Sequence, residues 1–310
     1  MSALARQSLA LGNNLHTVRP EHFSRPSCLY RQKKMKNTKI AFIGGGNMAR
    51  SIIGGLISAN TPPDKILVAE PSFATRDSLE QHFGVTTFAE NPAAAKQADV
   101  LVLAVKPQVM RDVLVALAST ITQAHPLLIS VAAGVTSRSI EKWSGGGSSL
   151  VRVMPNTPAL IRSGVSALFA NPDVTDEQRN IAESIMRAVG TTVWVDEESL
   201  MDSVTAVSGS GPAYFFYVMQ AIENAAKKEG LDHDTARLLT IETALGAARL
   251  ALESDESPGV LQERVTSPGG TTEAGIGVME SAKVNETLKQ AVSAAGRRSR
   301  ELAVLFGEDQ

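Results

Sequence analysis

Two patterns of apolar and polar residues divide this chain near residue 196. Before that point, short apolar runs of four to six residues alternate with segments of helical length and spacing. Runs that are apolar at almost every position are typical of strands covered on both faces, as in a parallel sheet. The strands expected on this basis are 39–44, 66–70, 100–105, 127–131, 150–153, 164–169 and 191–195, and the helices between them are 47–59, 72–83, 109–120, 137–143 and 175–189.

After residue 196 the strand pattern stops and helical spacing continues. Pro212 suits the first position of a long helix, and Gly230 suits the position just after its end. The expected helices are 212–229, 232–253, 258–265, 272–281 and 284–306. Strands alternating with helices, followed by helices alone, predict an α/β protein with a Rossmann-type doubly wound sheet over residues 37–196 and an all-α domain over residues 197–310.

The helix expected over residues 232–253 carries alanine and leucine around most of its circumference. A helix that is apolar on nearly every side has to be buried on nearly every side. A domain of about 110 residues is too small to enclose such a helix alone. We therefore expect the all-α domain to pair with that of a second copy of the chain, as a homodimer.

Composition argues against several classes of protein. The 310 residues are 43% hydrophobic and 20% charged, with a formal net charge of −2, so neither nucleic acid nor an anionic membrane surface is an expected partner. No apolar run reaches the roughly 18 residues that cross a bilayer. Cys28 is the only cysteine and the five histidines are scattered, so we expect neither metal nor thiol chemistry.

The first 36 residues hold seven lysines and arginines and a single acid, Glu21. Three interpretations of this basic leader stay open. It is a disordered tail, it lies upstream of a true translation start at Met35, or it is an organelle transit peptide. It lacks the apolar core of a signal peptide, so we expect a cytoplasmic rather than a secreted protein.

The run Gly44–Ala49 (GGGNMA) follows the first expected strand and opens the first expected helix. It fits the dinucleotide-binding fingerprint with alanine in the third position. Gly44 permits the tight turn, Gly46 lets the backbone approach a pyrophosphate, and Ala49 lets the helix lie close to the strand. The amides of the helix N-terminus favour phosphate groups. The residues expected to contact the nucleotide are Gly44, Gly46, Asn47, Met48 and Ala49.

Glu70 ends the second expected strand, about 20 residues beyond the glycines, where an acid accepts hydrogen bonds from the ribose hydroxyls of NAD. Ser72 and Arg76 follow closely and suit the 2′-phosphate of NADP instead. The choice between NADH and NADPH therefore stays open.

Other candidate residues follow later strands, at the sheet edge where such folds bind ligands. The turn Ala104-Val105-Lys106-Pro107 closes one strand, and Val131-Ala132-Ala133 closes the next with small residues that leave room for a flat nicotinamide. Asn156 lies in a loop (MPNTP) made rigid by two prolines, and rigid loops after strands often position ligands. We expect these residues to contact the coenzyme.

Two runs in the helical half combine hydroxyl side chains with glycine. The runs 208–212 (SGSGP) and 265–272 (VTSPGGTT) each precede an expected helix. Hydroxyls and uncovered amides at a helix N-terminus suit a carboxylate or another anion. Ordinary helix capping explains the first run equally well, whereas the second offers more hydroxyls than a cap needs.

With these motifs in view, the chain from about residue 39 to 305 resembles pyrroline-5-carboxylate reductases. The matching segments are IGGGNMA, LAVKPQ, SVAAGVT, MPNTPAL, AVSGSGPAY and VTSPGGTTEA. The resemblance implies a Rossmann domain and an interlocking helical domain that forms a dimer, within a larger ring or decamer in many relatives. It implies reduction of pyrroline-5-carboxylate to proline by NADPH or NADH. Glu70 departs from the small or hydroxylated residue of several relatives.

The resemblance also implies roles for individual residues. Cofactor contacts would come from Gly44–Ala49, Asn91, Ala104, Val105, Lys106, Pro107, Val131, Ala132, Ala133 and Glu198. The substrate carboxylate would lie on Ser267, Gly269, Gly270 and Thr271, with Thr272 beside the ring nitrogen as the catalytic residue.

Two other functions compete with this interpretation. A hydroxyacid or 6-phosphogluconate-type dehydrogenase needs a base, typically a lysine in the helical domain, but Lys227 and Lys228 lie at a polar helix end. A non-catalytic dinucleotide-binding protein would be expected to have lost the hydroxyls of Ser267 and Thr272, which are present.

Overall fold

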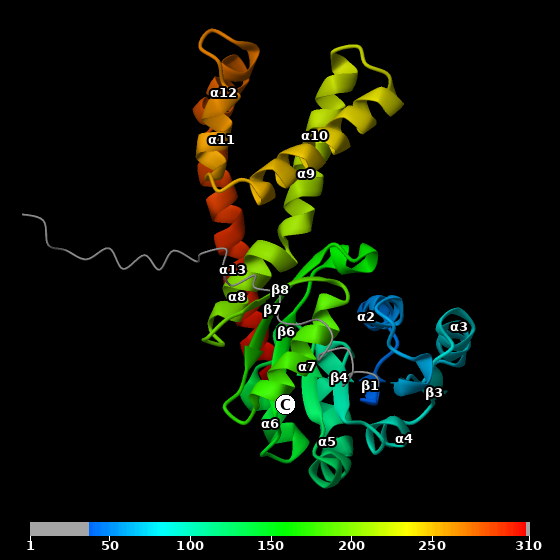
Figure 1. The fold of residues 1–310 in the computed structure, drawn as a ribbon. Coiled ribbons are helices and arrows are strands. Elements are labelled where there is room, and N and C mark those ends of the chain that lie inside the picture. The colour runs from blue at the N-terminus through cyan, green and yellow to red at the C-terminus, as the bar shows by residue number, and fades with distance from the viewer. Residues whose placement is uncertain (1–36, 308–310) are drawn as a thin grey trace, which may run out of the picture.

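The computed structural model describes residues 37–307, so the interpretations of residues 1–36 fall outside the described part of the chain (Figure 1). Its centre is an eight-stranded sheet with the order β3-β2-β1-β4-β5-β6-β7-β8. The strands are β1 (Ile40–Ile43), β2 (Ile66–Ala69), β3 (Thr86–Phe88), β4 (Val100–Leu103), β5 (Leu127–Ser130), β6 (Leu150–Met154), β7 (Gly164–Ala170) and β8 (Gly190–Trp194).

The direction of the strands decides where a ligand can bind. Strands β1 to β6 are mutually parallel, whereas β7 is antiparallel to β6, and β8 is parallel to β7. The carboxyl ends of six strands therefore meet at one edge. The strand order reverses beside β1, with β2 on one side and β4 on the other, and such reversals are where open α/β sheets bind ligands.

Helices cover both faces of the sheet. One face packs against α2 (Asn47–Ser58), α3 (Phe73–Phe83) and α7 (Asp176–Arg187), and the other against α4 (Asn91–Ala95), α5 (Pro107–Ala124) and α6 (Ser137–Ser144). Successive residues of β1 serve opposite cores, because Phe42 joins the first and Ile43 the second. This double burial is why the strands are apolar at every position.

All seven strands expected from the sequence are confirmed, as are the helices between them. The short β3 and α4 were not predicted. The sequence of β3 is Thr-Thr-Phe, and these residues are half-buried or exposed at the end of the sheet, so no apolar run marks them. Short 3-10 turns, η2 (Pro63–Lys65) and η3 (Thr157–Ile161), complete this half.

The second half contains only helices among the described residues, as expected. They are α8 (Leu200–Val204), the π-helical turn η4 (Thr205–Gly209), α9 (Gly211–Lys228), α10 (His233–Glu253), α11 (Pro258–Arg264), α12 (Thr271–Ser281) and α13 (Val284–Gly307). None of the helices within residues 37–307 is both long enough and apolar enough to span a membrane.

The run 208–212 leads into α9 as expected, with Pro212 in its first turn, but it does not present a free helix N-terminus. Helical backbone already runs from α8 through η4 into α9, and Ser210 itself has helical dihedral angles. The amide of Ser210 donates to the carbonyl of Thr205 at 2.8 Å, and the Ser208 hydroxyl donates to the Val204 carbonyl at 3.0 Å. These groups are used within the helix, so this run is no anion-binding helix N-terminus.

Figure 1 shows two arms rising from the sheet, one made of α9 and α10, the other of α11, α12 and part of α13. Both arms expose large apolar side chains, while α10 buries only Ala236 and Thr240 among its 21 residues. Exposed examples are Phe215, Phe216, Tyr217, Leu238, Leu239, Leu250, Leu252, Val278 and Met279. As expected from its sequence, residues 37–307 of one chain do not enclose α10.

Candidate active site

The residues predicted to hold a dinucleotide converge on the carboxyl edge of the parallel strands. Each group directly follows a strand or opens the next helix: Gly44–Ala49 after β1, Glu70 after β2, Asn91 after β3, Ala104–Pro107 after β4, Val131–Ala133 after β5, and Asn156 after β6. Because the sheet is parallel there, residues far apart in sequence form one continuous rim. Glu198 follows β8, which runs the other way, but its carboxylate reaches Ser137 at the start of α6, beyond the loop that follows β5.

Each glycine of the turn after β1 meets a different requirement. Gly44 has a φ of 97°, and a Cβ there would lie 2.9 Å from the carbonyl oxygen of Ala104. A Cβ on Gly45 would lie 2.8 Å from the Leu79 side chain. A Cβ on Gly46 would have no neighbouring atom within 4 Å. The first two glycines are required by packing, whereas Gly46 faces open space, which is the arrangement a bound pyrophosphate needs.

Helix α2 presents its N-terminus to that open space. Gly46 is the N-cap residue and no side chain caps the helix. The first amides of a helix lack intrahelical acceptors and carry a partial positive charge, which suits phosphate oxygens. Ala49 is fully buried in the core beneath, so the helix lies close against the sheet. These residues fit a dinucleotide.

The carboxylate of Glu70 is oriented by two backbone amides. Oε2 accepts from the Gly45 amide at 2.9 Å, and Oε1 accepts from the Ser72 amide at 3.0 Å. Glu70 is half-buried. The strand-end acid therefore touches the glycine turn itself.

Asn156 links the rim to the helical half. Its Oδ1 accepts from the Val165 amide at 2.9 Å, and its Nδ2 donates to the Ser208 carbonyl at 3.2 Å. Next to this contact, a Cβ on Gly209 would lie 2.4 Å from the methyl carbon of Met154. The two motifs MPNTP and SGSGP are thus packed together, and the glycine permits their close approach.

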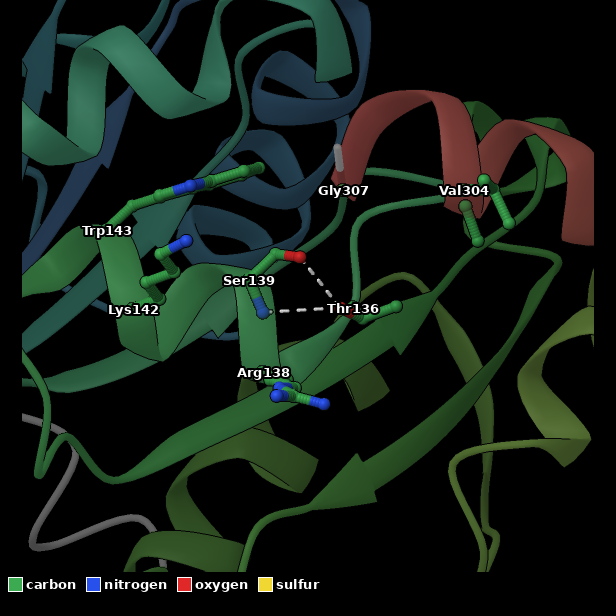
Figure 2. Close-up of a pocket in the computed structure, with 8 residues that line it drawn as sticks. Thr136, Arg138, Ser139, Lys142, Trp143, Val304 and Gly307 are labelled. Carbon is green, nitrogen blue, oxygen red and sulfur yellow. Dashed lines mark hydrogen bonds between the residues drawn. The ribbon is translucent and has the colours of Figure 1, made fainter. Parts of the chain in front are cut away.

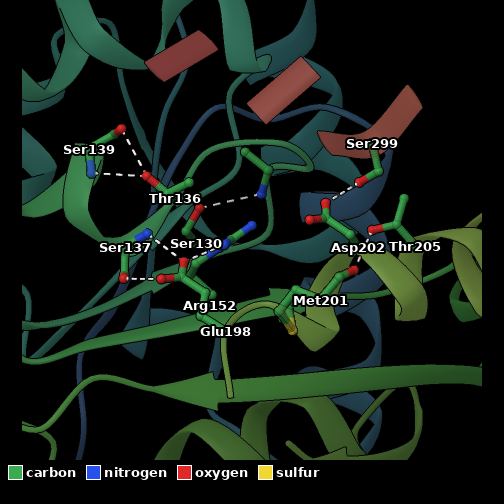
Figure 3. A network of polar contacts seen from close by, with 11 residues as sticks. Ser130, Thr136, Ser137, Ser139, Arg152, Glu198, Met201, Asp202, Thr205 and Ser299 are labelled. Atoms are coloured by element: carbon green, nitrogen blue, oxygen red, sulfur yellow. Dashed lines mark hydrogen bonds and ion pairs between the residues drawn. The ribbon is translucent and has the colours of Figure 1, made fainter. Parts of the chain in front are cut away.

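Glu198 belongs to a polar network at the junction of the two halves (Figure 3). Its carboxylate forms an ion pair with Arg152 of β6 and accepts from the amide of Ser137 at 2.7 Å and from its hydroxyl at 2.5 Å. Burial alone would raise the pKa of Glu198, but the Arg152 guanidinium and the Ser137 hydrogen bonds outweigh it and hold that pKa below its usual value. Sequence reasoning missed Arg152, because one charge inside an apolar strand gives no sign of its partner.

A cavity of about 390 Å³ lies between α6 and the end of α13 (Figure 2). Arg138, Lys142 and Trp143 line it from α6, and Val304 and Gly307 line it from α13. Nearby, a Cβ on Gly134 would lie 3.1 Å from the Phe306 ring. The last helix therefore packs against the loop that follows Val131–Ala133, a contact that the sequence did not indicate.

The hydroxyl-rich turn 265–272 leads into α12. Gly269 has a φ of 73°, and its amide donates to the Glu273 carboxylate at 2.7 Å, while the Gly270 amide donates to the Ser267 carbonyl at 3.0 Å. Thr271 and Thr272 are exposed in the first turn of α12, where helix amides lack intrahelical acceptors. Figure 1 shows α12 at the far end of its arm, away from β1 and α2. A single chain does not bring the glycine turn and the hydroxyl-rich turn together.

Comparison with known proteins identifies the relatives of both halves. A family model described as "Pyrroline-5-carboxylate reductase dimerisation" matches residues 198–302, and one described as "NADP oxidoreductase coenzyme F420-dependent" matches residues 39–134. The pyrroline-5-carboxylate reductase of Pseudomonas aeruginosa is 46% identical over 274 residues, which is 88% of this chain and 100% of the relative.

Solved structures agree with these sequence relatives. The pyrroline-5-carboxylate reductase of Coxiella burnetii has a TM-score of 0.82 and 48% identity, covering 86% of this chain and 98% of the other. A pyrroline carboxylate reductase of Plasmodium falciparum, solved with NADP bound, has a TM-score of 0.78 and 28% identity. The match covers 87% of this chain and 99% of the other. The chain therefore belongs to the pyrroline-5-carboxylate reductase family, whose members complete proline biosynthesis with NAD(P)H.

Proposed function

We propose that this reductase binds NAD(P)H along the rim of its sheet and seats 1-pyrroline-5-carboxylate on the first turn of α12 from a partner subunit. The observation that carries the proposal is the position of α12. Its exposed hydroxyls lie away from the glycine turn, on an arm that leaves large apolar side chains such as Val265, Val278 and Met279 exposed within residues 37–307. A dimer that buries the arms can bring the turn of one subunit to the rim of the other.

The substrate carboxylate suits the start of α12. The amides of Thr271 and Thr272 belong to the first helical turn, where the helix dipole favours a negative group. Ser267 adds a hydroxyl from the preceding loop. The Gly269 and Gly270 amides already have acceptors in the turn, so in this proposal they chiefly shape the loop, and Glu273 keeps its bend in place.

Coenzyme residues divide along the rim. Gly44–Ala49 hold the pyrophosphate at the start of α2, and Ala104–Pro107 with Asn91 border the nucleotide. Val131–Ala133 offer small side chains beside the nicotinamide. Asn156 acts by holding the rim to η4, because both ends of its amide are bonded within the chain. Glu198 likewise fixes the junction between the halves through its Arg152 and Ser137 contacts.

The chemistry needs little from the protein beyond position. A protonated cyclic imine is already an electrophile at carbon, and the reduced nicotinamide supplies a hydride from its C4. As the new C–H bond forms, the C=N π pair becomes the lone pair of the ring nitrogen, giving the secondary amine of proline. The Thr272 hydroxyl hydrogen-bonds that nitrogen and orients the ring. Holding the two reacting carbons in contact supplies most of the rate enhancement.

One assay separates this function from its two rivals. Oxidation of NADH or NADPH is followed with pyrroline-5-carboxylate and without substrate. Reduction of NAD⁺ or NADP⁺ is followed with hydroxyacids. Turnover only with pyrroline-5-carboxylate is expected. Turnover of a hydroxyacid alone, or coenzyme binding without turnover of any substrate, would contradict the proposal.

The chain offers a matched pair of variants for the Thr272 role. Thr272→Ala is expected to lower kcat/KM by about 10- to 100-fold, the value of one hydrogen bond to a charged group. Thr266→Ala is the control, because its hydroxyl donates back to the Gln262 carbonyl at 2.7 Å, in the last turn of α11. Thr272→Ser should restore most activity. Equal activities of the two alanine variants would remove Thr272 from the mechanism.

We also propose a domain boundary, a cellular location and an assembly for this protein. We propose that the chain divides into its two domains near Asp196, where the last strand has ended and α8 has not begun. We propose a cytoplasmic location, since a chain with Cys28 alone has no internal disulfide to maintain in an oxidising compartment. We propose a decameric ring of dimers, which light scattering tests by mass.

A further inference from the structure

The corner between β2 and the glycine turn holds a negative charge in a fixed position. The two carboxylate oxygens of Glu70 accept from the amides of Gly45 at 2.9 Å and Ser72 at 3.0 Å. The first amide belongs to the nucleotide-binding turn and the second to the loop before α3. Glu70 therefore joins the two segments between which the adenosine ribose of a dinucleotide lies in such folds.

The orientation of this carboxylate suits one kind of partner. Each carboxylate oxygen accepts one hydrogen bond from a backbone amide and has further lone pairs that can accept from other donors. Ribose 2′- and 3′-hydroxyls are donors and can complete that set. A 2′-phosphate has little to donate near neutral pH, and carries a charge of the same sign. The same corner therefore attracts a ribose diol and repels a phosphorylated one.

The arginines in the first turns of the two helices that follow this corner, Arg50 of α2 and Arg76 of α3, are already engaged. Arg76 donates through Nη1 to the carbonyls of Glu70 at 2.7 Å and Pro71 at 2.8 Å, and its guanidinium lies 5.8 Å from the centre of the Phe73 ring. Arg50 donates to the Ser78 hydroxyl at 3.1 Å and to the Thr75 carbonyl at 3.3 Å. Both arginines hold α3 and its loop in place, so recruiting either to a phosphate would break these contacts.

We propose that Glu70 is the residue that makes this reductase select NADH over NADPH. The proposal deepens the proposed function, since it concerns the coenzyme site of that reaction. Glu70 acts by direct contact with the ribose and by repulsion of a 2′-phosphate. Its bonds to Gly45 and Ser72 keep it from turning away when the larger coenzyme arrives.

Adenosine fragments test the proposal without the reaction. The unmodified protein should bind 5′-AMP at least about tenfold more tightly than adenosine 2′,5′-bisphosphate in calorimetry, because like charges in contact are strongly unfavourable. Glu70→Ser should lower the ratio of the affinity for 5′-AMP to that for adenosine 2′,5′-bisphosphate by about tenfold or more. Glu70→Gln, which keeps an amide-bonded oxygen but no charge, should move it in the same direction.

Kinetics supply the second measurement, as the ratio of kcat/KM for NADH to kcat/KM for NADPH. The ratio should favour NADH in the unmodified enzyme and fall in both Glu70 variants. Asp77→Asn is the control, because this substitution also removes one negative charge. Asp77 accepts a hydrogen bond from Gln81 within α3 and does not bond to the glycine turn. The control should leave both ratios unchanged.

These measurements distinguish failure of the Glu70 proposal from failure of the proposed function. An unmodified enzyme that prefers NADPH, or Glu70 variants whose fragment and coenzyme ratios match those of Asp77→Asn, would overturn the proposal. In the latter case Glu70 only braces Gly45. If no coenzyme is oxidised with pyrroline-5-carboxylate, the proposed function fails instead, and the fragment ratios still decide the role of Glu70.

Discussion

Replacing Glu198 with alanine is expected to destabilise the protein by about 2–3 kcal/mol. Removing one partner of a buried ion pair typically costs about 3–5 kcal/mol, because the other charge stays buried without compensation. The side chain of Arg152 is only 11% exposed, whereas that of Glu198 is 26% exposed, so water offsets part of the loss. The Ser137 amide and hydroxyl lose their acceptor in the same variant.

Urea unfolding at fixed protein concentration measures this change, since a dimer's stability depends on concentration. Glu197→Ala is the matched control: Glu197 is exposed, and its carboxylate accepts from the Ser199 hydroxyl at 3.3 Å. It should change stability by less than about 0.5 kcal/mol. The variant Arg152→Met combined with Glu198→Ala should recover much of the loss, because it leaves no unpaired charge.

The same carboxylate predicts a dependence on pH. Its folded-state pKa lies below the ordinary value of 4.5, so the deprotonated form is favoured by folding. The contribution of Glu198 is therefore fully present above pH 4.5 and is lost as the pH falls through the lower, folded-state pKa. The difference between the unmodified protein and Glu198→Ala should shrink over that interval. A difference below 0.5 kcal/mol at pH 7, or one that grows on acidification, would refute this reasoning about Glu198 (the threshold being about the scatter of surface substitutions).

Other predictions follow from close packing and exposure. Gly55→Ala should lower stability by about 2–4 kcal/mol in thermal unfolding, because its Cβ would lie 2.5 Å from the Ala188 carbonyl oxygen. Gly54→Ala in the same helix should be close to neutral, since its Cβ meets only the Phe83 ring at 3.2 Å; equal losses in both variants would contradict the packing argument. Leu239→Glu, on the exposed face of α10, should yield monomers in light scattering and abolish turnover while the sheet stays folded; an active dimer would show that this face is not the interface.

Much of the fold could be predicted because the parallel strands are buried on both sides. Residues such as Phe42 and Ile43 alternate between two cores, so their strand is apolar throughout and easy to recognise. The strand β3 gives no such signal at the sheet edge. The run 208–212 correctly marked the start of α9, but the helical turn η4 before it could not be predicted, because it depends on the packing of Gly209 against Met154.

The candidate site was predictable to the extent that it follows from strand direction. Once the strands are parallel, residues such as Gly44, Lys106 and Ala132 must meet at one edge. Contacts between distant residues could not be predicted from the sequence. Arg152 and Glu198 lie 46 positions apart, and the residues around each of them do not indicate that the two form an ion pair. The distance of α12 from the rim could not be predicted either, because it depends on how the arms leave the sheet and on what covers them.

In the proposed dimer, the coenzyme surface of one subunit meets the substrate surface of the other. Gly46→Asp places a charge at the proposed pyrophosphate site, in open space that should not disturb folding, and Thr272→Ala removes the hydroxyl proposed to contact the substrate. Each homodimer should be nearly inactive or strongly impaired. After the two are unfolded and refolded together, activity should rise to about a quarter of the unmodified value, because half of the dimers are mixed and each has one intact shared site. No gain over the average of the two separate variants would contradict a site shared between subunits.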